Sequence, residues 1–273
     1  MMQGRSISLI AAALVALMIA PAIAAKTRQR PLMVYAAGST TGVLGAMLKR
    51  YETETGQHVD LRTGPAGLMR QKIEDGDKVD LFISANMAHP RKLHDEGKAG
   101  AAAVFARNRL CIYALPAVGM TTANVLDRLL DPKVGIGTST PKADPGGDYA
   151  QELFDKADSV RPGATAVLKA KARAVVGGTI ETGPTRQITQ ADAMIERGTD
   201  VSVGYCSSRK TTPDPSVDKI ELPPELAIRA DYGIAIVTTS RNAQREAAAG
   251  QLALYLLAPE AQSLLADYGF TPR

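Results

Sequence analysis

Residues 34–42 read VYAAGSTTG, and this stretch decides the fold. Its apolar beginning predicts a short strand, the small residues after it predict a tight turn, and the apolar positions within residues 43–51 repeat at helical spacing. Ser39, Thr40 or Thr41 can cap that helix, while its first N–H groups lack intrahelical partners and lie at the positive end of the helix dipole. The stretch therefore offers a site for an anion, although an ordinary capped helix has the same local pattern.

Two further units of this kind follow along the chain. Residues 57–62 alternate as a strand and lead through a turn at 63–67 into a helix near 68–74. Residues 79–84 form a third apolar run ahead of a short helix. Three strand-helix units in succession predict parallel strands with right-handed crossovers, and hence an α/β fold.

The rest of the chain continues the alternation of strands and helices. Apolar runs predict strands at residues 110–115, 133–137, 201–205 and 232–237. Helical spacing predicts helices at residues 124–130, 187–197 and 241–268, the last interrupted by Pro259, and residues 209–224 read as a polar excursion. Small-residue turns lead into helices near four positions, which are Ser39, Ala66, Gly146 and Ile188. If these turns converge, their backbone N–H groups and hydroxyls form a cage for an oxyanion.

Composition limits the classes of partner. The 273 residues, 45% of them hydrophobic, suffice for one large or two small domains. Aromatic residues make up only 4% and tryptophan is absent, which does not suit an aromatic-lined carbohydrate or nucleic-acid surface. Because the lysines and arginines behind the net charge of +4 are scattered among acidic residues, no nucleic-acid partner is expected.

The first 24 residues have the three parts of a secretory signal peptide. Arg5 precedes an apolar run from Ile7 to Ile19, and small residues lead to a cleavage point after about Ala24. The apolar run is short for a membrane span, and no cysteine follows the cleavage point to accept a lipid. We therefore expect a soluble protein exported to the periplasm.

Cys111 and Cys206 are the two cysteines of the chain. In an oxidising compartment they can form one disulfide, which would close a loop of roughly 95 residues. Both also lie in apolar, strand-like runs, and this pattern favours two separate buried thiols over the cross-link. The sequence leaves both alternatives open.

Signals for catalysis or metal binding are weak. Ser139 with Lys142, and Ser207 with Lys210, have the Ser-x-x-Lys spacing of a serine hydrolase, but the companion motifs and a Gly-x-Ser-x-Gly elbow are absent from the sequence. The three histidines do not have the i, i+4 spacing that holds zinc on a helix. We expect no enzyme, no cofactor and no metal site, and keep a secreted Ser-x-x-Lys hydrolase as the rival class.

Five segments of the mature chain stand out together, at residues 34–39, 80–86 (DLFISAN), 145–150 (PGGDYA), 203–205 (VGY) and 268–270 (YGF). In these segments, and in their order, the chain resembles the molybdate-binding periplasmic proteins of ABC importers. The resemblance implies a type II periplasmic-binding fold, with two α/β lobes joined by a two-strand hinge and the ligand in the cleft.

The resemblance also implies boundaries and a function. Residues 32–110 and 235–273 would form lobe 1, residues 111–234 lobe 2, and the strands around Cys111 and at 232–237 would cross the hinge. The protein would capture molybdate or tungstate as a monomer and deliver it to the membrane subunits of an ABC importer, without catalysis.

The site residues that the resemblance implies come from both lobes. Ser39 and Tyr205 would contribute hydroxyls, and Gly146 and Ile188 backbone N–H groups. At the second loop the family usually has serines, whereas this chain has Ala66, which offers only its N–H. The lost hydroxyl keeps other ligands in view for the same fold, namely sulfate, phosphate, a small carboxylate or a metal.

Other side chains could complete such a site. Thr40 is a further candidate, and so is Arg186, whose guanidinium fork would suit an oxyanion; Arg62 and Arg70 are alternatives for that charge. Asp144 and Asp148 flank Gly146 and would repel an anion if they faced it, so we expect them to cap the following helix.

Overall fold

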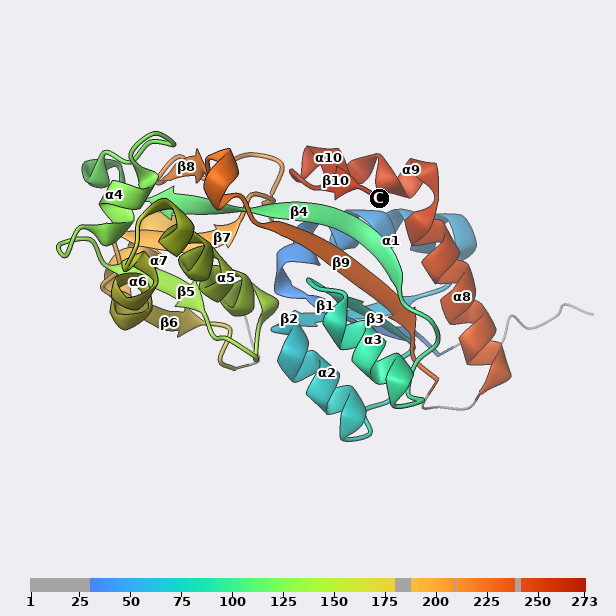
Figure 1. The fold of residues 1–273 in the computed structure, drawn as a ribbon. Helices are drawn as coiled ribbons and strands as arrows, with labels where there is room; N and C mark the ends of the chain where they lie inside the picture. The colour runs from blue at the N-terminus through green and yellow to red at the C-terminus, as the bar shows by residue number, and fades with distance from the viewer. Residues whose placement is uncertain (1–29, 180–187, 209, 239–241) are drawn as a thin grey trace, which may run out of the picture.

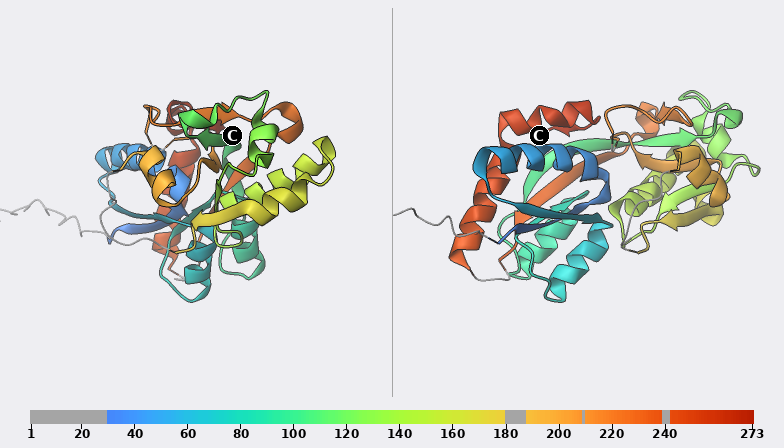
Figure 2. Two further views of the ribbon diagram at one scale, coloured as in Figure 1. Left: turned by 90° about the vertical axis from the view of Figure 1, so that its left-hand side faces the viewer. Right: turned by 180° about the vertical axis from the view of Figure 1, so that it is seen from behind.

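The computed structural model describes residues 30–179, 188–208, 210–238 and 242–273. The expected signal peptide and Arg186 lie outside these ranges. The chain is a mixed α/β structure whose two lobes lie side by side (Figures 1 and 2). Over the described ranges, no helix is both long and apolar enough to cross a membrane.

The first lobe is built from the three predicted strand-helix units. Its strands are β1 (Leu32–Ala37), β2 (Val59–Gly64) and β3 (Leu81–Ser84), and its helices are α1 (Thr41–Thr55), α2 (Ala66–Glu74) and α3 (Ala88–Asp95). β1 pairs in parallel with both β2 and β3, as predicted. One apolar face of α1 is buried, and the helix ends at Gly56, whose φ of 72° is the left-handed conformation that glycine adopts without strain.

Two long antiparallel strands connect the lobes. They are β4 (Ala103–Ala114) and β9 (Arg229–Ile236), which we call the hinge strands. β4 pairs with β9 over residues 103–109 and then with β7 (Val201–Tyr205) over residues 110–114. β9 in turn pairs with β3, so the main path through the sheet has the order β2-β1-β3-β9-β4-β7-β5-β6, in which β5 is Ile136–Ser139 and β6 is Ala172–Val176 (Figure 1).

The second lobe has its own parallel strands. β5 (Ile136–Ser139) pairs in parallel with β6 (Ala172–Val176) and with β7. The surrounding helices are α4 (Val125–Leu130), α5 (Pro145–Val160), α6 (Ala164–Lys171) and α7 (Gln190–Glu196). Residues 209–224 were expected to be a polar excursion, and this is wrong at Asp218–Glu221, which form strand β8 and pair with β4. Only Ile220 of β8 is buried, so this strand has no apolar alternation.

The C-terminal segment returns to the first lobe. It contains α8 (Ala243–Leu257), α9 (Pro259–Gln262), α10 (Leu264–Asp267) and β10 (Thr271–Pro272), and the expected break at Pro259 is present. Arg245 of α8 anchors it by pairing with both carboxylate oxygens of Asp80, whose side chain is only 4% exposed. Asp80 also accepts the N–H of Met33 at 2.7 Å, so this ion pair ties α8 to β1 and β3.

Each lobe has its own hydrophobic core. One cluster takes residues from 32–106 and 230–270, the other from 110–228. Tyr232 and Ile234 pack in the first cluster, although the boundaries implied by the sequence, at 110/111 and 234/235, assign them to lobe 2; those boundaries remain a proposal. Tyr149 and Tyr205 contact both clusters and therefore mark where the lobes meet.

The two cysteines form a disulfide. Cys111 in β4 and Cys206 just after β7 have their Cα atoms 4.9 Å apart across 95 residues of sequence. Of the two alternatives that the sequence left open, the structure has the cross-link. It fixes the residue that follows Tyr205 to a hinge strand.

Candidate functional site

Tyr205 stands at the junction of the lobes. It is the last residue of β7, and its ring makes edge-to-face contacts with Tyr149 of α5, at 6.3 Å between centroids, and with Tyr232 of β9, at 5.6 Å. The hydroxyl of Tyr113 donates to the Tyr205 carbonyl at 2.7 Å and fixes the backbone there. The strand end, the ring contacts and this hydrogen bond together hold the Tyr205 side chain in one position.

The Tyr205 hydroxyl is buried, and no described residue forms a hydrogen bond with it. Burial, with Tyr232 and Asp144 nearby, raises the pKa of Tyr205 well above its ordinary value. The group therefore stays protonated at neutral pH. A buried O–H without an acceptor is costly, so this hydroxyl is able to donate to a bound molecule.

Ser39 reaches the same place from the first lobe. It lies in the short 3-10 turn η1 (Gly38–Thr40) at the end of β1, and its Oγ is 2.8 Å from the hydroxyl oxygen of Tyr232. Since Tyr232 also packs on Tyr205, it connects these two predicted residues. The Thr40 hydroxyl is fully buried and donates to the Ala37 carbonyl at 2.7 Å, so the turn itself uses it.

Gly146, in the first turn of α5, places its backbone next to the ring of Tyr205. A Cβ at Gly146 would lie 3.6 Å from the Tyr205 ring and 3.2 Å from Ser139 Oγ, so glycine allows this close approach. Its N–H donates to the Asp144 carboxylate at 3.3 Å, which caps α5 as expected. Asp148 turns back to accept the N–H of Lys142 at 2.8 Å.

Ser139 is a residue that the sequence reasoning did not assign to this site. It ends β5, and its hydroxyl lies beside Gly146 and hence close to Tyr205. The sequence singled it out only for its spacing to Lys142, which is exposed. Ser139 offers the site a hydroxyl where Ala66 cannot.

Ala66 lies at a direct contact between the lobes. It begins α2 and is fully buried, and the next two N–H groups, of Gly67 and Leu68, donate to the Ala143 carbonyl at 3.0 and 3.3 Å. The carbonyl of the second lobe thus serves as the cap of α2. A Cβ at Gly67 would lie only 2.3 Å from the Lys142 carbonyl oxygen.

The structure does not join Ile188 to the other predicted residues. The expected helix start at 187 is wrong, because α7 begins at Gln190 and Thr189 is its N-cap. Thr189 and Asp192 form a capping box, and the N–H of Gln190 donates to Asp214 at 2.8 Å. The first N–H groups of α7 are therefore bonded to side chains of this chain, and Ile188 lies half-buried ahead of them.

The alternative arginines have other roles in the first lobe. Arg70 pairs with Glu74 on the same helix, and its Nε is buried without a hydrogen bond to any described residue. Arg62 is exposed and lies opposite Tyr35 in the register of β1 and β2. Over the described residues, neither arginine is hydrogen-bonded or ion-paired to Ser39 or Tyr205.

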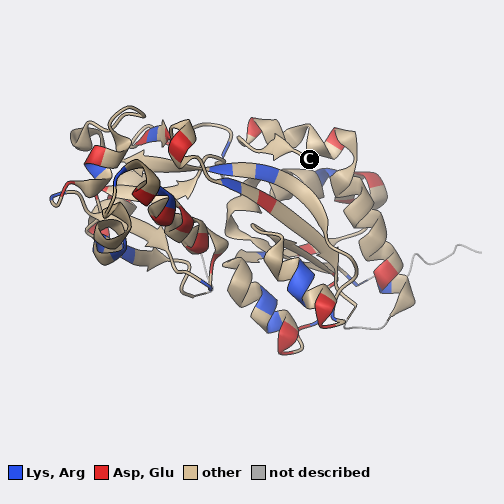
Figure 3. Cartoon of the chain, viewed as in Figure 1, with Lys and Arg blue, Asp and Glu red and all other residues tan. Residues whose placement is uncertain are grey.

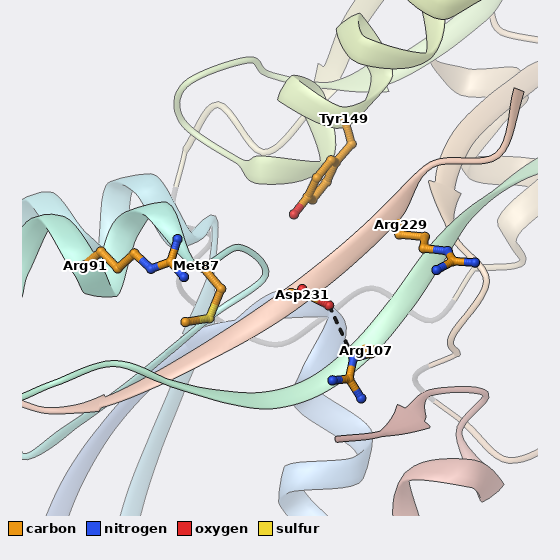
Figure 4. Close-up of a pocket in the computed structure, with 6 residues that line it drawn as sticks. All are labelled: Met87, Arg91, Arg107, Tyr149, Arg229 and Asp231. Atoms are coloured by element: carbon orange, nitrogen blue, oxygen red, sulfur yellow. Dashed lines mark ion pairs between the residues drawn. The ribbon is translucent and has the colours of Figure 1, made fainter.

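A separate pocket lies on the other face of the hinge strands. Its volume is about 400 Å³, and it contains none of the predicted site residues (Figure 4). Strand alternation turns Asn108 and Tyr232 inward and Arg107 and Asp231 outward, where Arg107 pairs with Asp231 at 3.6 Å. The remaining lining residues are Met87, Arg91, Tyr149 and Arg229. In the cartoon of Figure 3, blue segments mark basic residues on the hinge strands β4 and β9, and blue and red segments are mixed over the other elements.

In the described part of the chain, the side chains that could bind a metal ion or take part in serine catalysis are not clustered. Within it, no group of three or more His, Cys, Asp or Glu side chains is placed to hold a metal ion. The Ser207 hydroxyl accepts a hydrogen bond from Asn108 at 2.8 Å, while Lys210 is exposed.

Comparison with known proteins identifies the family. The family model described as bacterial extracellular solute-binding protein matches residues 32–271, and this chain belongs to that family. An uncharacterized protein of Pasteurella multocida is 37% identical over 196 residues, which cover 71% of this chain and 80% of the relative. The family and its structural neighbours are binding proteins.

Solved structures share the fold at low sequence identity. The periplasmic molybdate-binding protein of Azotobacter vinelandii superposes with a TM-score of 0.69 at 18% identity, covering 88% of this chain and 98% of that one. The sulfate-binding protein of Mycobacterium tuberculosis superposes with a TM-score of 0.70 at 15% identity, covering 89% and 87%. The fold is accordingly that of type II periplasmic binding proteins, and the solutes that these neighbours are named for differ.

Proposed function

We propose that this protein is a periplasmic solute-binding protein that captures a tetrahedral oxyanion, molybdate or tungstate, between its lobes and delivers it to an ABC importer. The observation that carries the proposal is the buried, protonated and unpaired hydroxyl of Tyr205 at the junction of the lobes. Further hydroxyls come from Ser39, which is hydrogen-bonded to the neighbouring Tyr232, and from Ser139, which lies next to Gly146. A site of uncharged donors suits an anion that carries no proton of its own.

Contacts between the lobes support capture by closure. The carbonyl of Ala143 accepts from the start of α2, and the Tyr149 hydroxyl donates to the Ala85 carbonyl at 3.2 Å. A ligand that contacts Ser39 and Tyr205 together completes its hydrogen bonds only when the lobes meet. Such a ligand binds the closed form better and shifts the equilibrium toward it.

A second candidate is a singly protonated oxyanion such as hydrogen phosphate. Burial is the main cause of the raised pKa of Tyr205 and of Tyr232, and Asp144 is near enough to raise the pKa of both hydroxyls further. A carboxylate at that position could accept the proton of such a ligand, whereas it would repel one that is fully deprotonated.

Thermal melting of the mature protein separates these candidates. We expect millimolar molybdate or tungstate to raise the melting temperature, because a ligand that binds only the folded state stabilises it by RT ln(1 + [L]/Kd). Sulfate, phosphate and small carboxylates form the comparison panel. Tyr205→Phe should abolish the shift, while Tyr255→Phe, in α8 and packed on Tyr51, should keep it. A shift with phosphate or a carboxylate alone would contradict molybdate as the ligand.

A further inference from the structure

The side-chain amide of Asn108 has one orientation. Asn108 is buried in hinge strand β4, and its Oδ1 accepts the N–H of Arg109 at 2.9 Å. A flipped amide would place two donors against each other there. The Nδ2 group therefore points the other way and donates to Ser207 Oγ at 2.8 Å and to the hydroxyl oxygen of Tyr232 at 3.3 Å.

This orientation fixes the direction of the next hydrogen bond. Tyr232 is fully buried, so its single hydroxyl proton needs an acceptor. Two described side chains form hydrogen bonds with it: Asn108 Nδ2, which can only donate, and Ser39 Oγ at 2.8 Å. The Tyr205 hydroxyl is also near, but it is outside hydrogen-bonding geometry. Tyr232 consequently donates to Ser39, and the proton of Ser39 is left to point elsewhere.

We infer that Asn108, acting through Tyr232, sets Ser39 as a hydrogen-bond donor toward the ligand and so selects oxyanions that present only acceptors. The inference rests on the proposed function of the Ser39 and Tyr205 site and names the ligand class that this site takes. Asn108 and Tyr232 are positioning residues. They lie on the two hinge strands, outside the motifs that carry the family resemblance.

The surroundings hold this relay in place. Asn108 is opposite Ala230 and Tyr232 opposite Ala106 in the register of the hinge strands, so the two side chains are diagonal neighbours on the inward face. The other amide partner, Ser207, directly follows Cys206, which the disulfide ties to β4. Backbone pairing therefore fixes the positions of Asn108 and Tyr232, and the disulfide holds the residue before Ser207 to the same strand.

Asn108→Asp is the most direct test. The new carboxylate oxygen is an acceptor where Nδ2 was a donor, so Tyr232 now donates its proton to residue 108. Ser39 then donates to Tyr232, and a lone pair of the Ser39 hydroxyl faces the ligand in place of its proton. We expect the ratio of molybdate affinity to hydrogen phosphate affinity, measured by calorimetry at pH 7, to fall by about 100-fold, because a misdirected polar group in a site discriminates strongly. Tyr232→Phe leaves Ser39 free to donate or accept, and should lower the ratio by about tenfold. Folding of each variant is verified by its melting temperature.

Two outcomes keep this inference separate from the proposed function. If the native protein binds an oxyanion that Tyr205→Phe abolishes, yet Tyr232→Phe and folded Asn108→Asp keep the ratio within about twofold of native, the inference is overturned while the function stands. If the native protein binds no oxyanion, the proposed function fails. The first hydrogen bond of the relay can then still be tested in the ligand-free protein, because Tyr232→Phe must shift the NMR signals of the Asn108 side-chain NH₂, and unchanged signals overturn the relay.

Discussion

Gly67 controls how closely the two lobes approach. A Cβ at this position would lie 2.3 Å from the Lys142 carbonyl oxygen and 2.8 Å from that of Ala143, which are backbone atoms of the other lobe. Gly67→Ala must therefore hold the lobes apart and break the two hydrogen bonds to Ala143. At a net value of about 1 kcal/mol for each bond, closure is disfavoured by about 2 kcal/mol, which weakens a ligand that needs closure by about 30-fold.

Calorimetry of the oxyanion that gives a melting shift measures this loss. Small-angle scattering should show a larger radius of gyration for Gly67→Ala with ligand than for the native protein. The matched control is Gly45→Ala, also a helical glycine of the first lobe, where a Cβ would meet no atom within 4 Å. It should leave affinity unchanged and raise stability by about 0.5–1 kcal/mol. Native affinity in Gly67→Ala would refute the link between this contact and binding.

Three further predictions concern stability. Arg245→Met should lower the free energy of unfolding by about 3–5 kcal/mol in denaturant titrations, because it leaves the buried Asp80 carboxylate without its cation, and a loss below about 1 kcal/mol would contradict the anchoring role. Reducing the disulfide between Cys111 and Cys206 should lower the free energy of unfolding by about 4 kcal/mol by the loop-entropy model. A mild reductant should therefore lower the melting temperature of the native protein but not that of the double variant Cys111→Ala/Cys206→Ala. Equal melting temperatures for the oxidised and reduced native protein would refute this prediction. Burial lowers the pKa of His89 to about 4, below its unfolded value near 6.5, so the unfolded chain takes up this proton first and stability should fall as pH drops from 6.5 to 4. His89→Gln should flatten that part of the stability profile, and an unchanged profile would exclude His89 as its cause.

The sequence predicts the strand-helix units well because their signals are local. The buried face of α1, the glycine stop at Gly56 and the strand that ends at Tyr205 all follow from periodicity and turn chemistry. The start of α7 was predicted wrongly although it too had a local signal, because Thr189 and Asp192 have capping-box spacing. Helix α6 and strand β6 were missed, and β6 has no fully buried residue to mark it.

The site depends on contacts between distant residues, which the sequence could not supply. Tyr232 meets Ser39 across 193 positions and Asn108 across 124, and it reads in the sequence as an ordinary apolar strand residue. Ser139 lies beside Gly146 only because β5 packs against α5. The hydrogen bonds from the first N–H groups of α2 to the Ala143 carbonyl likewise form only where the two lobes meet.

Anomalous diffraction from crystals grown with molybdate, collected at the molybdenum edge, locates the bound anion. One strong peak should appear between the lobes, within hydrogen-bond distance of the hydroxyls of Tyr205 and Ser39. A peak only in the arginine pocket on the outer face of the hinge strands, or no peak beside Tyr205 at saturating molybdate, would contradict the proposed function.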